Sequence, residues 1–187
     1  EKIFEKIKEN EKTHTIQLPY LQVFLDKLYD ESTGHDKTHQ SDAVFTIDAI
    51  NKMGNIATIL DSFLEEQVTA ISLKFSTKQK PLTNDDIWDI LSPFVSIEGT
   101  KEPISLSNLL RKLPGVDPGT VKGVVDAFIN CRILRYIADR NIYELMHDTL
   151  AKKIASTRSE EEVELLAIRK IIAQKKEEDD LLNEKQL

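Results

Sequence analysis

The chain is poor in the residues that build disulfide-bonded and turn-rich folds. It has one cysteine, Cys131, and only six glycines and six prolines among its 187 residues. A single cysteine cannot form an internal disulfide, which fits a reducing compartment, and its apolar neighbours predict a buried, inert thiol. The scarcity of glycine and proline argues against a β-sandwich with many turns, so we expect a mainly α-helical protein.

Long hydrophobic runs and targeting segments are also missing. No apolar stretch approaches the roughly 20 residues that a membrane span needs, and the first residues do not form a signal peptide. We therefore expect a cytoplasmic protein without membrane contact. The chain begins at Glu1 rather than at methionine, and we interpret it as a piece of a longer protein.

Sequence motifs of common catalytic sites are absent as well. Without a Gly-x-x-x-x-Gly-Lys-Ser/Thr loop, nothing in the chain would cradle a nucleoside triphosphate and its magnesium. There is no Gly-x-Ser-x-Gly, Cys-x-x-Cys or His-Glu-x-x-His motif. His35, Asp36 and His39 have a spacing that could hold a metal on a helix, but their Gly, Ser and Thr neighbours predict a solvated loop. We expect that this chain is not an enzyme by itself.

Charge is distributed unevenly along the chain. The net charge of −7 divides into −7 for residues 1–104, +4 for residues 105–158 and −4 for residues 159–187. An acidic protein repels nucleic acid, so only the middle segment is a candidate for DNA binding.

Residues 1–80 predict a small helical bundle. Leu21, Leu25 and Leu28 recur at helical spacing after Pro19, which suits a first helical turn. The polar segment 32–41 predicts a loop, and the lysine-rich stretch 74–81 predicts a linker. A second helix after Gly54 has a broad apolar face. This face consists of Ile56, Ile59, Leu60, Phe63, Leu64 and Ile71.

Residues 81–158 predict a winged-helix domain. Thr83 and Asp86 have the spacing of a helix-starting capping box. After that helix we expect a short extended piece at Pro103 and Ile104, helices over 106–113 and 118–130, and a β-hairpin of 133–137 with 142–146. Helix, strand, helix, turn, helix and hairpin is the winged-helix order.

Residues 159–187 predict a C-terminal connector helix. Ser159 and Glu162 have the spacing of a second capping box, ahead of a helix through Val163, Leu166 and Ile171. A charged tail follows from residue 175 to residue 187.

The most informative stretch is 142–158, where a short strand leads to His147 and then to a helix that Asp148 can cap. A histidine beside the N–H groups and the positive dipole end of a helix suits an anion such as phosphate. Taken alone, His147 also fits a strand-end residue whose ring satisfies a neighbouring backbone group. Asp148 likewise fits an ordinary N-cap.

The junction from Tyr143 to Ala151 resembles the Glu-Leu-x-His-Asp/Glu-x-Leu-Ala pattern of the STAND ATPases, the signal-transduction ATPases with numerous domains. The bacterial, novel-STAND-type branch of these AAA+ modules continues with a basic helix and an arginine, here Lys152, Lys153 and Arg158. Residues 18–22, Leu-Pro-Tyr-Leu-Gln, are similar to the Leu-Pro-x-Leu-Gln start of that family's helical lid. Many such lids carry a glycine where this chain has Ile16 or Gln17.

The resemblance implies the lid and winged helix of an ADP/ATP-dependent signalling switch. Pro19 would help to wall the adenine site, His147 would approach the β-phosphate of ADP, and Asp148 would orient the histidine or cap the next helix. ADP or ATP would be bound only in a longer parent protein. The implied partners are an N-terminal P-loop ATPase core, absent here, and a downstream sensor or effector domain.

Two other functions remain open from the residues. In a winged-helix DNA-binding regulator, residues 118–130 would be the recognition helix, but its one lysine, Lys122, is opposed by Asp126. Arg132, Arg135 and Arg140 on the hairpin could contact phosphate. A protein–protein adaptor is the third interpretation.

Overall fold

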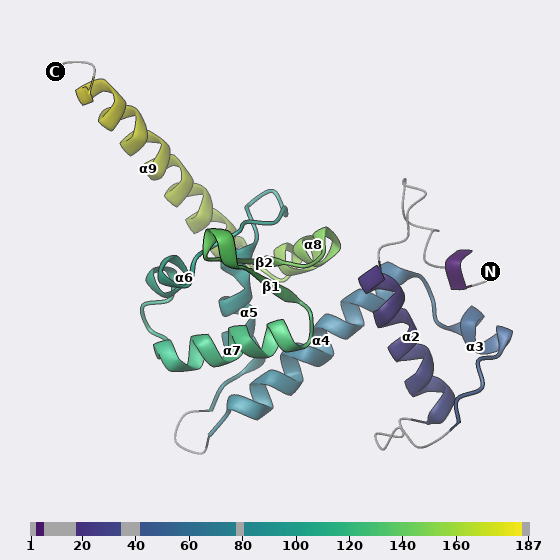
Figure 1. Cartoon of the computed structure of the whole chain (residues 1–187). Coiled ribbons are helices and arrows are strands. Elements are labelled where there is room, and N and C mark those ends of the chain that lie inside the picture. The colour runs from purple at the N-terminus through teal and green to yellow at the C-terminus, as the bar shows by residue number, and fades with distance from the viewer. Residues whose placement is uncertain (1–2, 6–17, 35–41, 78–80, 185–187) are drawn as a thin grey trace. The chain divides into compact units, whose positions relative to one another are not determined.

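The computed structural model describes residues 3–5, 18–34, 42–77 and 81–184 (Figure 1). The chain forms two compact units, residues 1–70 and residues 71–187. The boundary lies within helix α4 (Ile56–Phe75), so the expected domain limits at residues 80 and 158 stay predictions. The described residues are mainly helical and include a small two-stranded antiparallel sheet, which confirms the expected fold class at that level.

Unit 1 contains α2 (Leu18–Thr33), α3 (Ile47–Lys52) and most of α4. Pro19 lies in the first turn of α2, as predicted. Apolar side chains from the three helices are buried together, which is the expected consequence of their helical spacing. The buried side chains are those of Phe24, Leu28, Ile50, Ile56, Ile59, Leu60, Leu64 and Val68.

Two details of unit 1 differ from the prediction. Helix α3 was not expected; its N-cap is Thr46, whose side chain accepts the N–H of Ala49 at 3.1 Å. Helix α2 runs to Thr33, into the expected loop 32–41. His35, Asp36 and His39 lie outside the described residues, and within the described ranges no His, Cys, Asp and Glu cluster suits a metal ion.

Unit 2 follows the predicted order of helices and strands. The predicted capping box at its start is formed: Asp86 N–H donates to Thr83 Oγ1 at 3.2 Å, and Thr83 N–H donates to Asp86 Oδ2 at 2.7 Å. The elements are α5 (Asn84–Leu91), η1 (Ser92–Phe94), α6 (Leu106–Lys112), α7 (Pro118–Asn130), β1 (Leu134–Ile137), η2 (Ala138–Arg140), β2 (Ile142–Leu145), α8 (Asp148–Ser156) and α9 (Glu160–Glu184).

The two strands form the predicted hairpin. Leu134 pairs with Leu145 and Ile137 with Ile142 in an antiparallel register. The turn between them ends at Asn141, whose φ of 52° is left-handed, a conformation that asparagine tolerates. Ile104 adds a bridge to the other side of β2, with its N–H 2.9 Å from the carbonyl oxygen of Tyr143. The expected extended piece at Pro103 and Ile104 is therefore present.

The core of unit 2 forms around α7. The buried side chains that α7 contributes are Val121, Val124, Val125 and Phe128. On another face of α7, Gly123 lies against the ring of Phe75: a Cβ at this position would come within 2.6 Å of Cε1. Glycine is needed here because it has no Cβ, so the end of α4 can lie close to α7.

The end of the chain is more helical than predicted, since α9 continues to Glu184 through most of the expected charged tail. Ser159 Oγ accepts the N–H of Glu162 at 3.2 Å, as in the predicted cap, while the Glu162 carboxylate accepts a hydrogen bond from Ser92 Oγ at 2.7 Å. Across the described parts of the chain, every helix is too short or too polar to cross a bilayer.

Cys131 is half-buried, whereas a buried thiol was expected. Desolvation raises the pKa of this thiol to about 11, and Sγ donates to the carbonyl oxygen of Phe128 at 3.5 Å. The thiol is therefore protonated at neutral pH, and its inertness stays a prediction.

Candidate functional site

His147 lies at the junction between β2 and α8. It is the N-cap residue of α8, with extended backbone angles of φ −128° and ψ 136°, and Asp148 is the first helical residue. The prediction that Asp148 caps this helix is therefore wrong by one position. The Asp148 side chain is 84 % exposed, and its negative charge is favourable in the first turn of a helix.

The His147 side chain is buried and neutral at neutral pH. The residue is 4 % exposed. Its pKa is lowered to about 4, first by desolvation and then by the nearby charge of Lys101, with Asp148 acting in the opposite direction. The neutral ring keeps one N–H donor and one acceptor nitrogen. In this conformation the ring is turned into the protein.

Lys101 is the neighbour of His147 that the sequence analysis missed. Its Nζ donates to the carbonyl oxygen of Met146 at 3.2 Å and lies 3.0 Å from Asp148 Oδ1. Backbone pairing of Val95 with Lys101 holds the lysine in place. No local signal could have identified it, because Lys101 and Met146 are 45 residues apart in the sequence.

The charges around the junction are paired. Arg135 on β1 donates through Nε to Glu144 on β2 at 2.6 Å, and Lys101 is paired with Asp148. With two cations and two carboxylates, the formal charge of this group is zero. Attraction of an anion would therefore depend on the helix end and on exchange of the Lys101–Asp148 contact.

Beyond the other end of α8, Arg158 binds the backbone of the α5–η1 corner. Its guanidinium donates to Ser96 O at 2.7 Å, to Ser92 O at 2.7 Å, to Val95 O and to Ser92 Oγ at 3.0 Å. The side chain is 2 % exposed. Ser92 O and Ser96 O also accept backbone N–H groups, from Val95 and Gly99. Arg158 adds charged donors to this corner and fixes the end of α8 to it.

Pro19, the third predicted site residue, belongs to unit 1, whereas His147 and Asp148 belong to unit 2. The structure brings His147 and Asp148 together at the start of α8. The predicted role of Pro19 beside adenine stays a prediction.

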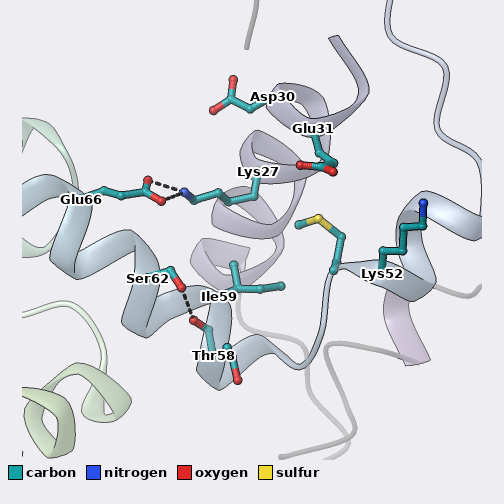
Figure 2. Close-up of a pocket in the computed structure, with 9 residues that line it drawn as sticks. Lys27, Asp30, Glu31, Lys52, Thr58, Ile59, Ser62 and Glu66 are labelled. Atoms are coloured by element: carbon teal, nitrogen blue, oxygen red, sulfur yellow. Dashed lines mark hydrogen bonds and ion pairs between the residues drawn. The ribbon is translucent and has the colours of Figure 1, made fainter. Parts of the chain in front are cut away.

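Unit 1 also contains a cavity of about 570 Å³ between α2, α3 and α4 (Figure 2). Pro19 is not among its lining residues. Two amines and three carboxylates line it, and Figure 2 shows Lys27 ion-paired with Glu66 across the cavity. Because the charges are mixed and partly paired within the wall, the cavity does not select a ligand of one charge.

Comparisons with protein-family models, with curated proteins and with solved structures found no match to this chain.

Proposed function

We propose that this chain is the helical lid and winged-helix portion of a STAND-type ATPase, in which His147 contacts the β-phosphate of ADP held by a P-loop core. The observation that carries the proposal is the position of His147 at the N-cap of α8, directly after the β1–β2 hairpin. The core would belong to a longer protein that includes this chain.

The order of elements in unit 2 supports the winged-helix part of the proposal. Helix α5, the bridge at Ile104, helices α6 and α7 and the β1–β2 hairpin follow one another as in that fold. In this interpretation the hairpin is the wing, and His147 lies at its exit. Residues 1–80 would be the lid, with Pro19 near the adenine.

The chemistry of the junction suits a contact that forms only in one state. When the core docks, the buried ring of His147 must turn outward to reach a phosphate. There the N–H groups of the first turn of α8 and the Lys101 ammonium would share the negative charge. A charge-assisted hydrogen bond contributes about 1.5–3 kcal/mol, enough to bias a two-state equilibrium by roughly tenfold or more.

This contact would act as a latch between two domains. It would hold the winged helix against the core while ADP is bound, because the phosphate is its shared partner. Exchange of ADP for ATP, or a pull from a downstream domain, would release it and shift the population toward the open state.

A DNA-binding function has less support from the same residues. Lys122 on α7 is ion-paired with Asp126, at 2.6 Å from Oδ2, and Arg135 on the hairpin is paired with Glu144. Two of the cations that would contact DNA phosphates are therefore already neutralised. We favour the nucleotide switch over the DNA-binding regulator for this reason.

The test is to purify the longer protein without added nucleotide, denature it and quantify the nucleotide released. The wild type should carry nearly stoichiometric ADP, and His147→Ala should carry much less. Ser156→Ala, an exposed substitution at the far end of the same helix, is the matched control and should behave like the wild type. Equal ADP in the wild type and His147→Ala would refute the role of His147. No nucleotide in any of them would refute the switch.

A further inference from the structure

One side of helix α9 contacts other elements of unit 2. Near its start, Glu162 accepts the hydrogen bond from Ser92, and two turns later Lys170 is ion-paired with Glu98. Between these contacts, Leu165, Leu166 and Arg169 line a groove of about 670 Å³ beside the η1 turn, with Leu165 more than half exposed. This side of the helix is occupied by its own unit.

The adjoining side of α9, which begins at Leu165, presents a stripe of large aliphatic residues to solvent. Their spacing of three and four residues places them on one helical face. The aliphatic stripe consists of Leu165 (55 % exposed), Ile168 (46 %), Ile171 (55 %) and Ile172 (61 %). Single exposed aliphatic residues are ordinary, but a contiguous group is typical of an interaction surface.

The charges at the two ends of the aliphatic stripe have opposite sign. Glu161 and Glu164 precede it, Lys175 and Lys176 follow it, and all four side chains are exposed. A partner that matches this surface needs a cation opposite the first turn and an anion opposite residues 175–176. A parallel copy of the same helix fails this requirement because like charges would meet.

An antiparallel copy meets it. With Ile168 placed opposite its own counterpart on a two-fold axis, Leu165 lies level with Ile171 of the second copy and Glu161 with Lys175. In the same register Glu164 lies level with Ile172. Glu161 and Lys175 lie about 21 Å apart along the helix, at 1.5 Å per residue. Two such ion pairs would therefore bracket the aliphatic contact, one at each end. A surface that is complementary to itself in this way is what a two-fold interface requires.

We propose that the aliphatic stripe of α9 is a dimerisation surface, which a second copy of this chain covers in antiparallel orientation. This inference is independent of the nucleotide switch. Ion pairs at the rim specify the antiparallel orientation, because a parallel copy would bring like charges together, and the aliphatic side chains supply the apolar contact.

The first experiment is sedimentation equilibrium of the 187-residue chain over a wide range of concentration. We expect a monomer–dimer equilibrium in the wild type and at least about tenfold weaker dimerisation in Ile168→Glu, because two carboxylates would meet at the two-fold axis. Val163→Glu changes an aliphatic residue of the same helix outside the stripe and should dimerise like the wild type. A chain that stays monomeric throughout, or equal weakening by both variants, would overturn the proposal.

Charge reversal then tests the orientation. Glu161→Lys and Lys175→Glu should each weaken the dimer by about tenfold at low salt, since each creates two like-charge contacts. The double variant should recover the wild-type dimerisation constant, and the differences should shrink at high salt. Single variants without effect, or a double variant no tighter than the singles, would contradict the antiparallel arrangement.

Discussion

The two residues that bracket helix α8 show opposite ways of burying an ionisable side chain. After the helix, Arg158 keeps its charge and is surrounded by carbonyl oxygens. Before the helix, His147 is 4 % exposed, and desolvation lowers its pKa to about 4, so it is neutral. Burying a charge costs free energy unless the charge is paired. Arg158 avoids this cost by hydrogen-bonding to carbonyl oxygens, and His147 avoids it by staying neutral.

The difference between these two ends bears on function. A guanidinium bound to three carbonyl groups holds its place, so Arg158 fixes the C-terminal end of α8. A neutral imidazole can gain a proton, or a phosphate partner, when its surroundings change. The same helix therefore combines a rigid anchor with an end that can respond to a ligand.

The largest expected effect is loss of the anchor. Arg158→Ala should lower the free energy of unfolding of unit 2 by about 3–5 kcal/mol, because several charge-assisted hydrogen bonds to the α5–η1 corner would be lost together. Urea unfolding followed by fluorescence of Trp88, the single tryptophan, reports on this unit. Arg140→Ala, on the exposed η2 turn, should stay within about 0.5 kcal/mol of the wild type. A similar small loss in Arg158→Ala would contradict the anchoring role.

The pH dependence of stability should isolate the other end of α8. In the unfolded chain His147 binds a proton below pH about 6.5, but in the folded chain only near pH 4. The unfolded state therefore binds more protons in this window, and stability falls as the pH falls through it. We expect a loss of about 2–3 kcal/mol between pH 7 and pH 4.5.

The matched control for this pH effect is His147→Gln, which has no titrating ring. Its stability should fall less steeply over the same window, by the amount assigned to His147. Parallel curves for the two proteins would mean that His147 is not held neutral.

The contact between Gly123 on α7 and Phe75 at the end of α4 is purely apolar, so its loss can be compared with the loss of the Arg158 hydrogen bonds. Gly123→Val should destabilise unit 2 by about 1–3 kcal/mol, since the new side chain would overlap the ring of Phe75. Adding Phe75→Ala should recover part of the loss, measured by a double-mutant cycle with the same urea unfolding. Additive effects would show that the two positions do not touch.

The smallest expected effects are shifts in the pKa of His147 itself. Lys101→Met removes a positive charge that lowers this pKa, so the pKa should rise; Asp148→Asn removes a negative charge, so it should fall. Histidine NMR titration of the two variants reads both signs directly. Shifts in the same direction would contradict the electrostatic description of the junction.

The features that depend on neighbouring residues were accessible from the sequence. The capping box of Thr83 and Asp86, the hairpin and the first-turn position of Pro19 each follow from spacing within a few residues. His147 was placed correctly at the strand–helix junction, although the cap was assigned to Asp148. Boundaries of helices depend on one backbone angle and commonly shift by a residue.

The features that depend on distant residues were not accessible. Lys101 and Arg158 act on backbone atoms far away in the sequence, and nothing near either residue indicates those partners. In the sequence Gly123 is a glycine inside a predicted helix, and its contact with the ring of Phe75 is visible only in the structure. Helix α3 is only six residues long, too short for a helical pattern to identify it.

The most direct test of the proposed latch is the pKa of His147 in the longer protein, measured by histidine NMR with and without bound ADP. Contact with a phosphate favours the protonated ring, so we expect a pKa near 4 without nucleotide and a clearly higher value with ADP. An identical pKa in the two states would mean that the ring stays buried and that His147 does not contact the nucleotide.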